Sequence, residues 1–253
     1  MTDPAPWPAD GLRVLDAGAA PPAWNMAIDE ALLLASGPPT LRLYRWDPPG
    51  LSLGWFQDGA AFAEVPGRHR VVRRRTGGGA IYHDDELTFA LTLDAELLPK
   101  DVAASYVLLH TAVQVALAAV GVPTELVRGA GAPSGRSRGS GWCFATAGPH
   151  DLVAAASRRK IVGSAQRRVR APRARVLHHG SIVLHAPTAT PFCGAVADSV
   201  DPHQVEDRLR NELSAALATA LRLRPMPGTL TPAEQSSARD RLSFYEDAGR
   251  VAR

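Results

Sequence analysis

RRRTGGGAIYH, residues 73–83, places three successive arginines and three successive glycines ahead of an apolar segment. Three glycines in a row let main-chain N–H groups approach a ligand closely and form a concave, anion-binding turn. The stretch therefore predicts a cradle for an acyl, phosphate or carboxylate group. A tight turn between strands with a solvated basic flank is an equally weighted alternative. A Walker-type phosphate loop is excluded, because the Gly-Lys-Ser/Thr signature is absent.

Helix and strand patterns lie on both sides of this turn. Apolar residues at helical spacing predict a helix over 25–35 with Asn25 as its N-cap. Asp101 opens a longer helix with one apolar stripe, and Gly121 closes it. The other expected elements are strands over 41–46, 51–55 and 89–93, a hairpin formed by 160–170 and 176–185, and helices that begin at Asp201-Pro202 and at the capping box 231–234.

Length and composition fit one α+β catalytic domain. With 253 residues and 45% apolar composition, the chain can bury one substantial core. We expect a poorly structured segment over 1–20, the catalytic domain over 21–225 and a C-terminal helical extension over 226–253. The segment 129–141, GAGAPSGRSRGSG, has no large apolar side chain to dock it. It is expected to form a flexible loop that leads directly to Trp142-Cys143-Phe144.

Hydropathy and cysteine content exclude several classes of protein. No apolar run approaches the roughly 20 residues that would span a bilayer, and residues 1–10 do not resemble a secretory signal. We therefore expect a soluble, cytoplasmic protein. Cys143 and Cys193 are too few for a disulfide framework and lack the spacing of a zinc site, so no metal is expected.

The basic residues are almost all arginine. Only two of the 28 basic residues are lysines, Lys100 and Lys160, and the net charge is +3. Arginine clusters lie at 73–75, 158–159 and 167–175, and they suit an acidic partner. Nucleic acid is a poor candidate for that partner, because the clusters lack the interleaved aromatic residues of a base-stacking surface.

Cys143 and Lys160 are the residues that we expect to carry chemistry. A nearby ammonium favours a thiolate and can donate to a thioester oxygen as it becomes an oxyanion. In a chain this rich in arginine, a lysine at position 160 suits a single carbonyl oxygen better than a planar guanidinium would. The alternatives are an inert buried cysteine, which is common for free Cys, and an ordinary surface lysine.

Three further segments accompany this pair. Gly163-Ser164-Ala165 is small, which leaves room for a substrate or permits close strand packing. His178 and His179 precede Gly180 in a strand and face opposite ways, so at most one of them lines a given pocket. Cys193 is expected to be a packing residue.

Several motifs, taken in order, resemble those of the biotin/lipoate protein ligase superfamily. They are NMAIDEALL at 25–33, LRLYRWDPPGLSLGWFQ at 41–57, RRRTGGGAIYHDDELTF at 73–89, RKIVGSAQRR at 159–168 and HHGSIVL at 178–184. Within the superfamily the chain is most similar to the octanoyltransferases that use an internal cysteine. The resemblance implies an α+β fold with a mixed central sheet flanked by helices, and an acyl tunnel lined by the Gly-rich turn.

The resemblance also implies roles for particular residues. Cys143 would receive the acyl group, and Lys160 would contact the acyl carbonyl. The expected substrate-binding residues are Arg74, Thr76, Gly77, Gly78, Gly79, Ala80, His83, Gly163, Ser164, Ala165, His179 and Gly180.

The implied partners are two proteins. Octanoyl acyl carrier protein would donate the acyl group. A lysine of a lipoyl domain, in a 2-oxoacid dehydrogenase E2 component or in the glycine-cleavage H protein, would accept it. The implied reaction needs no ATP or other cofactor, no metal, no nucleic acid and no membrane.

Two other functions stay open. An ATP-dependent lipoate ligase shares the RRxTGGGA and KxxGSA strings, but it forms an acyl-adenylate and does not need the cysteine. Cys143-Phe144 and the short stretch after the last strong helix argue against a ligase. A non-catalytic acyl-binding protein would keep the pocket without turnover.

Overall fold

The apolar and alternating segments of the sequence form one large mixed β-sheet. The computed structural model describes residues 7–62, 64–65, 70–129, 141–171 and 173–247. Across the sheet the strand order is β11-β1-β2-β6-β10-β9-β8-β7. The strands are β1 (Gly11–Ala20), β2 (Thr40–Trp46), β6 (Glu86–Asp94), β7 (Thr124–Leu126), β8 (Leu152–Ala154), β9 (Lys160–Val169), β10 (Arg175–Val183) and β11 (Arg224–Pro227). The pairs that include β1 are parallel, and the others are antiparallel.

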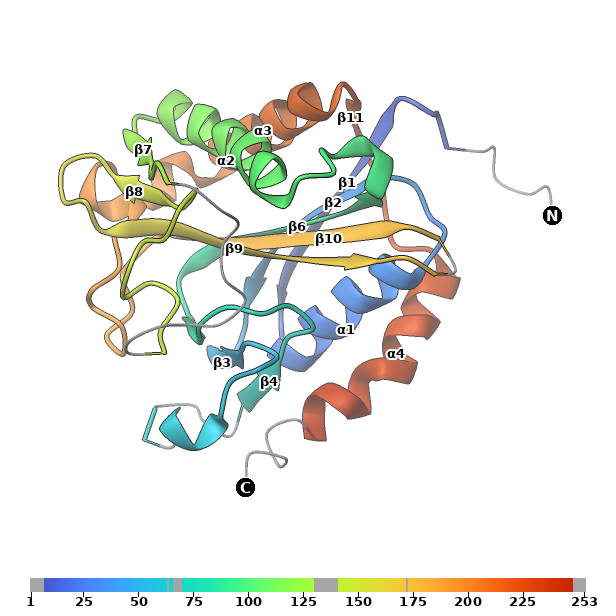
Figure 1. The fold of residues 1–253 in the computed structure, drawn as a ribbon, viewed down its shortest axis with the longest axis horizontal. Coiled ribbons are helices and arrows are strands. Elements are labelled where there is room, and N and C mark those ends of the chain that lie inside the picture. Colours follow the sequence, from blue (N-terminus) through green and yellow to red (C-terminus); the bar gives the residue numbers. More distant parts are fainter. Residues whose placement is uncertain (1–6, 63, 66–69, 130–140, 172, 248–253) are drawn as a thin grey trace.

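Two helices cover each face of this sheet (Figure 1). On one face lie α2 (Val102–Ala119) and α3 (Pro202–Leu221), which pack against each other and form the larger apolar cluster with the strands. On the other face lie α1 (Pro22–Leu34) and α4 (Pro232–Asp247), which also pack against each other. The predicted fold class, a mixed central sheet flanked by helices, is confirmed.

A small second sheet lies on the side of α1 and carries the Gly-rich turn. Its strand order is β4-β3-β5, with β3 at Gly50–Leu53, β4 at Val71–Arg73 and β5 at Ile81–His83. Because β4 and β5 both pair with β3, residues 74–80 must turn back across the end of this sheet. A short 3-10 helix, η1 (Gly59–Phe62), lies between β3 and β4.

Several helix boundaries follow the expected capping chemistry. Asp101 accepts a hydrogen bond from the Ala104 N–H at the start of α2, and Asp201 accepts one from His203 at the start of α3. At α4, Thr231 and Glu234 bond reciprocally, side chain to backbone, as a capping box requires. The predicted hairpin is also present, since β9 and β10 pair antiparallel.

Two predictions near the N-terminus are wrong. Residues 11–20 form strand β1, although a poorly structured segment was expected over 1–20. Strand β1 pairs with β2 on one side and with β11 on the other, and β2 and β11 are far apart from each other in sequence. Helix α1 begins at Pro22, which needs no N–H partner at the first helical position. Asn25 is therefore not its cap, and its side-chain amide instead donates to the carbonyls of Ala20 and Arg45.

Helix α2 is long and apolar enough to cross a membrane by length and composition alone, with a mean hydropathy of 1.6. In this fold its apolar stripe, which includes Leu109, Val113 and Leu117, packs into the core between the sheet and α3. Those contacts are typical of a core helix. Most of the loop expected over 129–141 lies outside the described residues, which include only Gly129 and Gly141.

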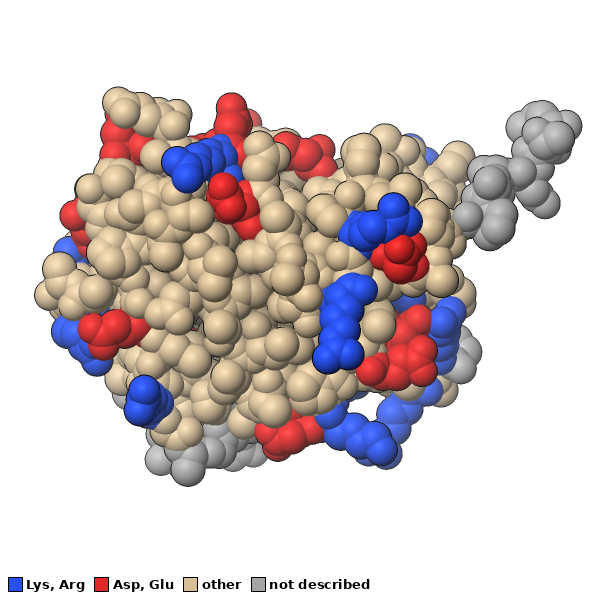
Figure 2. Space-filling model, turned by 90° about the horizontal axis from the view of Figure 1, so that it is seen from above, with Lys and Arg blue, Asp and Glu red and all other residues tan. Residues whose placement is uncertain are grey.

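Charged residues are sparse on the face formed by α2 and α3. Figure 2 shows this face, where Lys and Arg side chains occur singly or beside Asp and Glu. On α3, Arg208 forms a salt bridge with Glu212. The part of this face built from described residues carries no continuous basic stripe.

Candidate functional site

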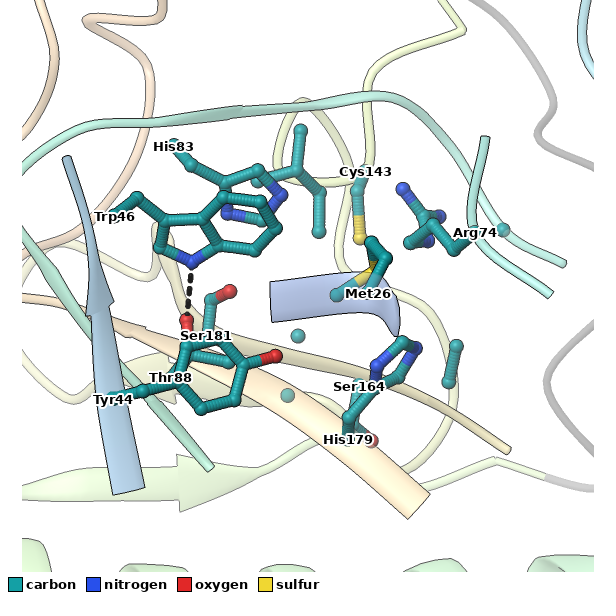
Figure 3. A pocket seen from close by; sticks show the side chains of 15 residues that line it. Met26, Tyr44, Trp46, Arg74, His83, Thr88, Cys143, Ser164, His179 and Ser181 are labelled. Atoms are coloured by element: carbon teal, nitrogen blue, oxygen red, sulfur yellow. Dashed lines mark hydrogen bonds between the residues drawn. The ribbon is translucent and has the colours of Figure 1, made fainter. Parts of the chain in front are cut away.

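A pocket opens between α1, the small sheet and strands β9 and β10. Its empty volume is about 380 Å³, a figure that includes space open to solvent. Its lining residues are Met26, Tyr44, Trp46, Arg74, Gly78, Ile81, His83, Thr88, Cys143, Gly163, Ser164, Ala165, His179, Gly180 and Ser181. Figure 3 shows Cys143 and Arg74 on one side of the pocket and Tyr44 and Thr88 on another, where the Trp46 indole N–H donates to Thr88 at 2.8 Å.

The Gly-rich turn holds the segment that carries the thiol. The Cys143 N–H donates to the Ala80 carbonyl at 2.9 Å, and the Ala80 N–H donates to the Gly141 carbonyl at 2.8 Å. A Cβ atom on Gly79 would lie 2.6 Å from the Cys143 nitrogen. Glycine at position 79 therefore lets residues 141–143 lie directly against the turn.

Lys160 lies between the thiol and a carboxylate. Its Nζ is 3.5 Å from Cys143 Sγ and 2.8 Å from Asp151 Oδ2. Burial lowers the pKa of Lys160, but the negative charges of Cys143 and Asp151 outweigh burial and raise it overall. Lys160 is only 6% exposed, so its ammonium acts in a poorly solvated place where electrostatic interactions are strong.

Gly163 lets the thiol and the ammonium meet. A Cβ atom at this position would lie 2.8 Å from Lys160 Cε and 3.1 Å from Cys143 Sγ. The first distance is shorter than real Cβ contacts, and the second is tighter than most of them. Gly163 belongs to the small segment that was predicted to leave room for a substrate. In the structure, the side chains of Cys143 and Lys160 occupy the space beside it.

The three arginines before the turn bond to the protein itself. Arg73 donates to three main-chain carbonyls, those of residues 54, 55 and 57. Arg74 donates to both the carbonyl and the hydroxyl of Ser52 and to the carbonyls of Gly77 and Gly79. Arg75 pairs with Glu30 at 2.8 Å. The alternative of a tight turn between strands agrees with the structure, because residues 74–80 join β4 to β5. Its basic flank, however, is bonded to the protein, and Arg74 braces the turn itself.

A buried chain of hydrogen bonds runs from Arg74 to Glu86. Arg74 donates to Ser52, whose hydroxyl lies 2.7 Å from His83 Nε2, and His83 Nδ1 lies 2.8 Å from Glu86. Burial lowers the pKa of His83, so its imidazole is neutral at neutral pH. Burial raises the pKa of Glu86, but His83 and two hydroxyl donors outweigh it and lower the pKa overall. Glu86 is thus a buried carboxylate that fixes one wall of the pocket.

His179 faces the pocket and His178 faces α2. His179 Nε2 is 2.8 Å from the Thr76 hydroxyl, and its Nδ1 is 3.3 Å from the buried carboxylate of Asp29. His178 instead lies against Tyr106 of α2. The strand alternation that predicted opposite orientations is confirmed.

The predicted residues occupy two zones. Lining the pocket are Cys143, Arg74, Gly78, His83, Gly163, Ser164, Ala165, His179 and Gly180. In contact with these lining residues are Thr76, Gly77, Gly79, Ala80 and Lys160. Cys193 is 2% exposed and packs in a small apolar cluster. Substrate contact by any of these residues stays a prediction.

Sequence reasoning missed several residues of the site. Met26, Tyr44 and Trp46 line the pocket, but on a helix and a strand they follow the same apolar pattern as core residues. Asp151 was not predicted as a site residue either; it lies directly before the strand that begins at Leu152. Among the described residues, no three His, Cys, Asp or Glu side chains gather as a metal site would require.

The arrangement is a small-molecule pocket that ends at a thiol paired with a buried ammonium. The chain belongs to the lipoyl protein ligase A/B catalytic domain family, whose sequence model matches residues 21–212. The resemblance inferred from the motifs is thereby confirmed.

Three known proteins illustrate the relationship. Octanoyltransferase LipM of Symbiobacterium thermophilum is 34% identical over 89% of this chain and 92% of its own length. Octanoyltransferase LipM of Kyrpidia tusciae is 32% identical over 92% and 95%. The structure of a bipartite lipoate protein ligase from Thermoplasma acidophilum superposes with a TM-score of 0.70 and 22% identity, covering 94% of this chain and 95% of that one. That last likeness concerns the fold.

Proposed function

We propose that this protein moves an octanoyl group from acyl carrier protein, through a thioester on Cys143, to a lysine of a lipoyl domain. The prediction that the chain is an octanoyltransferase of lipoate biosynthesis is confirmed by the curated relatives, which carry that name. The thioester and the two protein partners are the proposed parts. The observation that carries them is the 3.5 Å approach of Lys160 Nζ to Cys143 Sγ at the pocket.

The first half-reaction is thioester exchange. The Cys143 thiolate attacks the carbonyl carbon of the carrier-bound octanoyl thioester, and the tetrahedral intermediate collapses with loss of the carrier thiolate. Lys160 donates a hydrogen bond to the oxyanion, because its ammonium is buried beside the sulfur. The alkyl chain would lie in the pocket between α1 and β10.

The second half-reaction forms an amide. The neutral amine of the acceptor lysine attacks the acyl-enzyme, the Cys143 thiolate leaves, and the proton lost by nitrogen passes to solvent. A thioester is a higher-energy acyl donor than an amide, so the transfer needs neither ATP nor a metal. We propose lipoyl domains as the acceptor class; in support, the Thermoplasma ligase of similar fold is described together with its E2 lipoyl domain. The H protein of glycine cleavage fits the same chemistry.

Intact-mass spectrometry of the purified protein tests this proposal. The protein is mixed with octanoyl carrier protein without ATP, and its mass is recorded before and after addition of a lipoyl domain. One octanoyl adduct is expected on wild type and on the matched control Cys193→Ala, with no adduct on Cys143→Ala. The adduct should then move to the lipoyl domain.

Two other outcomes would replace the proposal. Modification of the lipoyl domain only after addition of free octanoate and ATP would identify a ligase. Absence of modification under both conditions would favour a non-catalytic acyl-binding protein. The partner and thioester assignments would then both be withdrawn.

A further inference from the structure

Asp151 links the loop that carries Cys143 to the strand that carries Lys160. One oxygen of its carboxylate, Oδ2, accepts from Lys160 Nζ at 2.8 Å and from the Gly148 N–H at 2.7 Å. Asp151 is 12% exposed and Lys160 is 6% exposed, so this ion pair is largely removed from water. Within the described parts of the chain, Asp151 is the one carboxylate that forms a salt bridge with Lys160.

The backbone is shaped to aim this carboxylate. The preceding residue, His150, has a φ of 70°, in the left-handed region that residues other than glycine seldom adopt. The Val127 carbonyl accepts from the His150 N–H, and the Asp151 carbonyl accepts from the Val127 N–H. Such strain persists only where surrounding bonds impose it, and it gathers at functional sites.

The charge around Lys160 changes during the proposed reaction. When Cys143 attacks as a thiolate, the ammonium has two anionic neighbours, this thiolate and the Asp151 carboxylate. Acylation turns the thiolate into a neutral thioester, and only Asp151 then remains as an anionic partner. A buried ammonium without such a partner is costly and gives up its proton.

The other groups that face this pair do not replace Asp151. His110 of α2 lies nearby, and burial lowers the pKa of His110, so it is neutral at neutral pH. Burial raises the pKa of Tyr106, which also lies on α2, and keeps its phenol protonated. His150 adds no negative charge, and the Phe144 ring lies 5.5 Å from Nζ and offers only a cation–π contact.

We propose that Asp151 is a positioning residue for the second half-reaction, where it holds Lys160 in place as an ammonium after Cys143 has been acylated. This inference rests on the proposed function, since it assigns Asp151 a role in discharging the acyl-enzyme. It acts through Lys160 and touches no reacting atom. Thioester formation depends less on Asp151, because at that stage the Cys143 thiolate itself keeps Lys160 protonated and in place.

The test separates the two half-reactions. Wild type, Asp151→Asn, Asp151→Glu and the control Asp198→Asn are each loaded from octanoyl carrier protein, and acylation is followed by rapid-quench intact mass. The acyl-enzymes are then mixed with a lipoyl domain at several values between about pH 6.5 and 9.5. Asp198 is a suitable control because it pairs with Arg159, the neighbour of Lys160 in sequence, and lies outside the pocket.

Asp151→Asn is expected to acylate within about threefold of wild type and to transfer more slowly. Loss of the carboxylate lowers the pKa of Lys160, and each pH unit above that pKa leaves about tenfold less of the ammonium. The ratio of wild-type to variant transfer rates should grow with pH. The acceptor's own titration cancels in that ratio. Asp151→Glu should recover part of the rate, and Asp198→Asn should match wild type.

Two results would overturn the inference. One is equal slowing of both half-reactions with a ratio that does not change with pH, which would indicate a purely structural role. The other is wild-type behaviour of Asp151→Asn in both steps. If Asp151→Asn fails to fold, the same pH ratio measured on Asp151→Glu decides. Failure of wild type to acquire any acyl group would instead reject the proposed function.

Discussion

Replacing Gly163 by alanine should slow thioester formation on Cys143 by about 10²-fold in a protein that still folds. The added Cβ would lie 2.8 Å from Lys160 Cε and 3.2 Å from its Nζ, whereas carbon atoms pack at about 3.5–4.0 Å. The lysine end must therefore shift by several tenths of an ångström or more, and its 3.5 Å contact with the thiol is disrupted. Misplacement of reacting groups by about 1 Å costs about 10²-fold, or about 2.7 kcal/mol of activation free energy.

Stability should change little in the same variant. Gly163 is not among the glycines with positive φ, so alanine can adopt its backbone conformation, and the atoms it displaces belong to the end of a flexible side chain. The assay is the rate of octanoyl adduct formation by rapid-quench mass spectrometry, with the thermal midpoint as the folding control. A wild-type acylation rate in a folded Gly163→Ala protein would refute the role given to this contact. A parallel loss of rate and folding would also contradict it.

Three further predictions concern other buried groups. Burial raises the pKa of Cys193 to about 11, so iodoacetamide at pH 8 should label one cysteine of the native protein and two after denaturation, as counted by mass. Since interactions with His83 hold the pKa of Glu86 below its unfolded value, Glu86 contributes stability above about pH 4.5 that is lost as the pH falls. Urea unfolding of Glu86→Gln should therefore depend less on pH between about 5 and 3 than that of wild type. Glu234→Ala leaves the buried Arg13 unpaired and should lower the free energy of unfolding by about 3–5 kcal/mol, also measured in urea.

Local patterns in the sequence predicted most of the fold. The two long helices α2 and α3, their Asp caps and the β9–β10 hairpin depend on neighbours in sequence, and each lies where the pattern placed it. Strand β1 was missed because neither of its parallel partners forms a hairpin with it: β2 follows only after α1, and β11 comes from the far end of the chain. Asn25 was misread as a cap for a related reason, since the Arg45 carbonyl that it binds comes from another element.

The site was predictable where one residue type suggests one chemistry. A lysine retained in an arginine-rich chain and a cysteine beside a Gly/Ser-rich segment suggested that Cys143 pairs with Lys160, and the motif resemblance implied their roles. The pocket walls were not predictable, because Met26 and Trp46 look like core residues until the cavity is seen. Asp151 gave almost no signal, because a single acidic residue before a strand is usually a solvated one.

The Gly-rich turn shows that a sequence motif does not by itself determine the chemistry of a site. Its arginines and glycines suggested an anion cradle, yet Arg74 spends its donors on Ser52 and on the turn's own carbonyls. The backbone of the turn lies directly against residues 141–143. This contact places the thiol at the pocket and within reach of Lys160. The same turn could support a different chemistry if another segment lay across it. The identity of the reaction therefore depends on which side chain that segment delivers, and here it delivers Cys143.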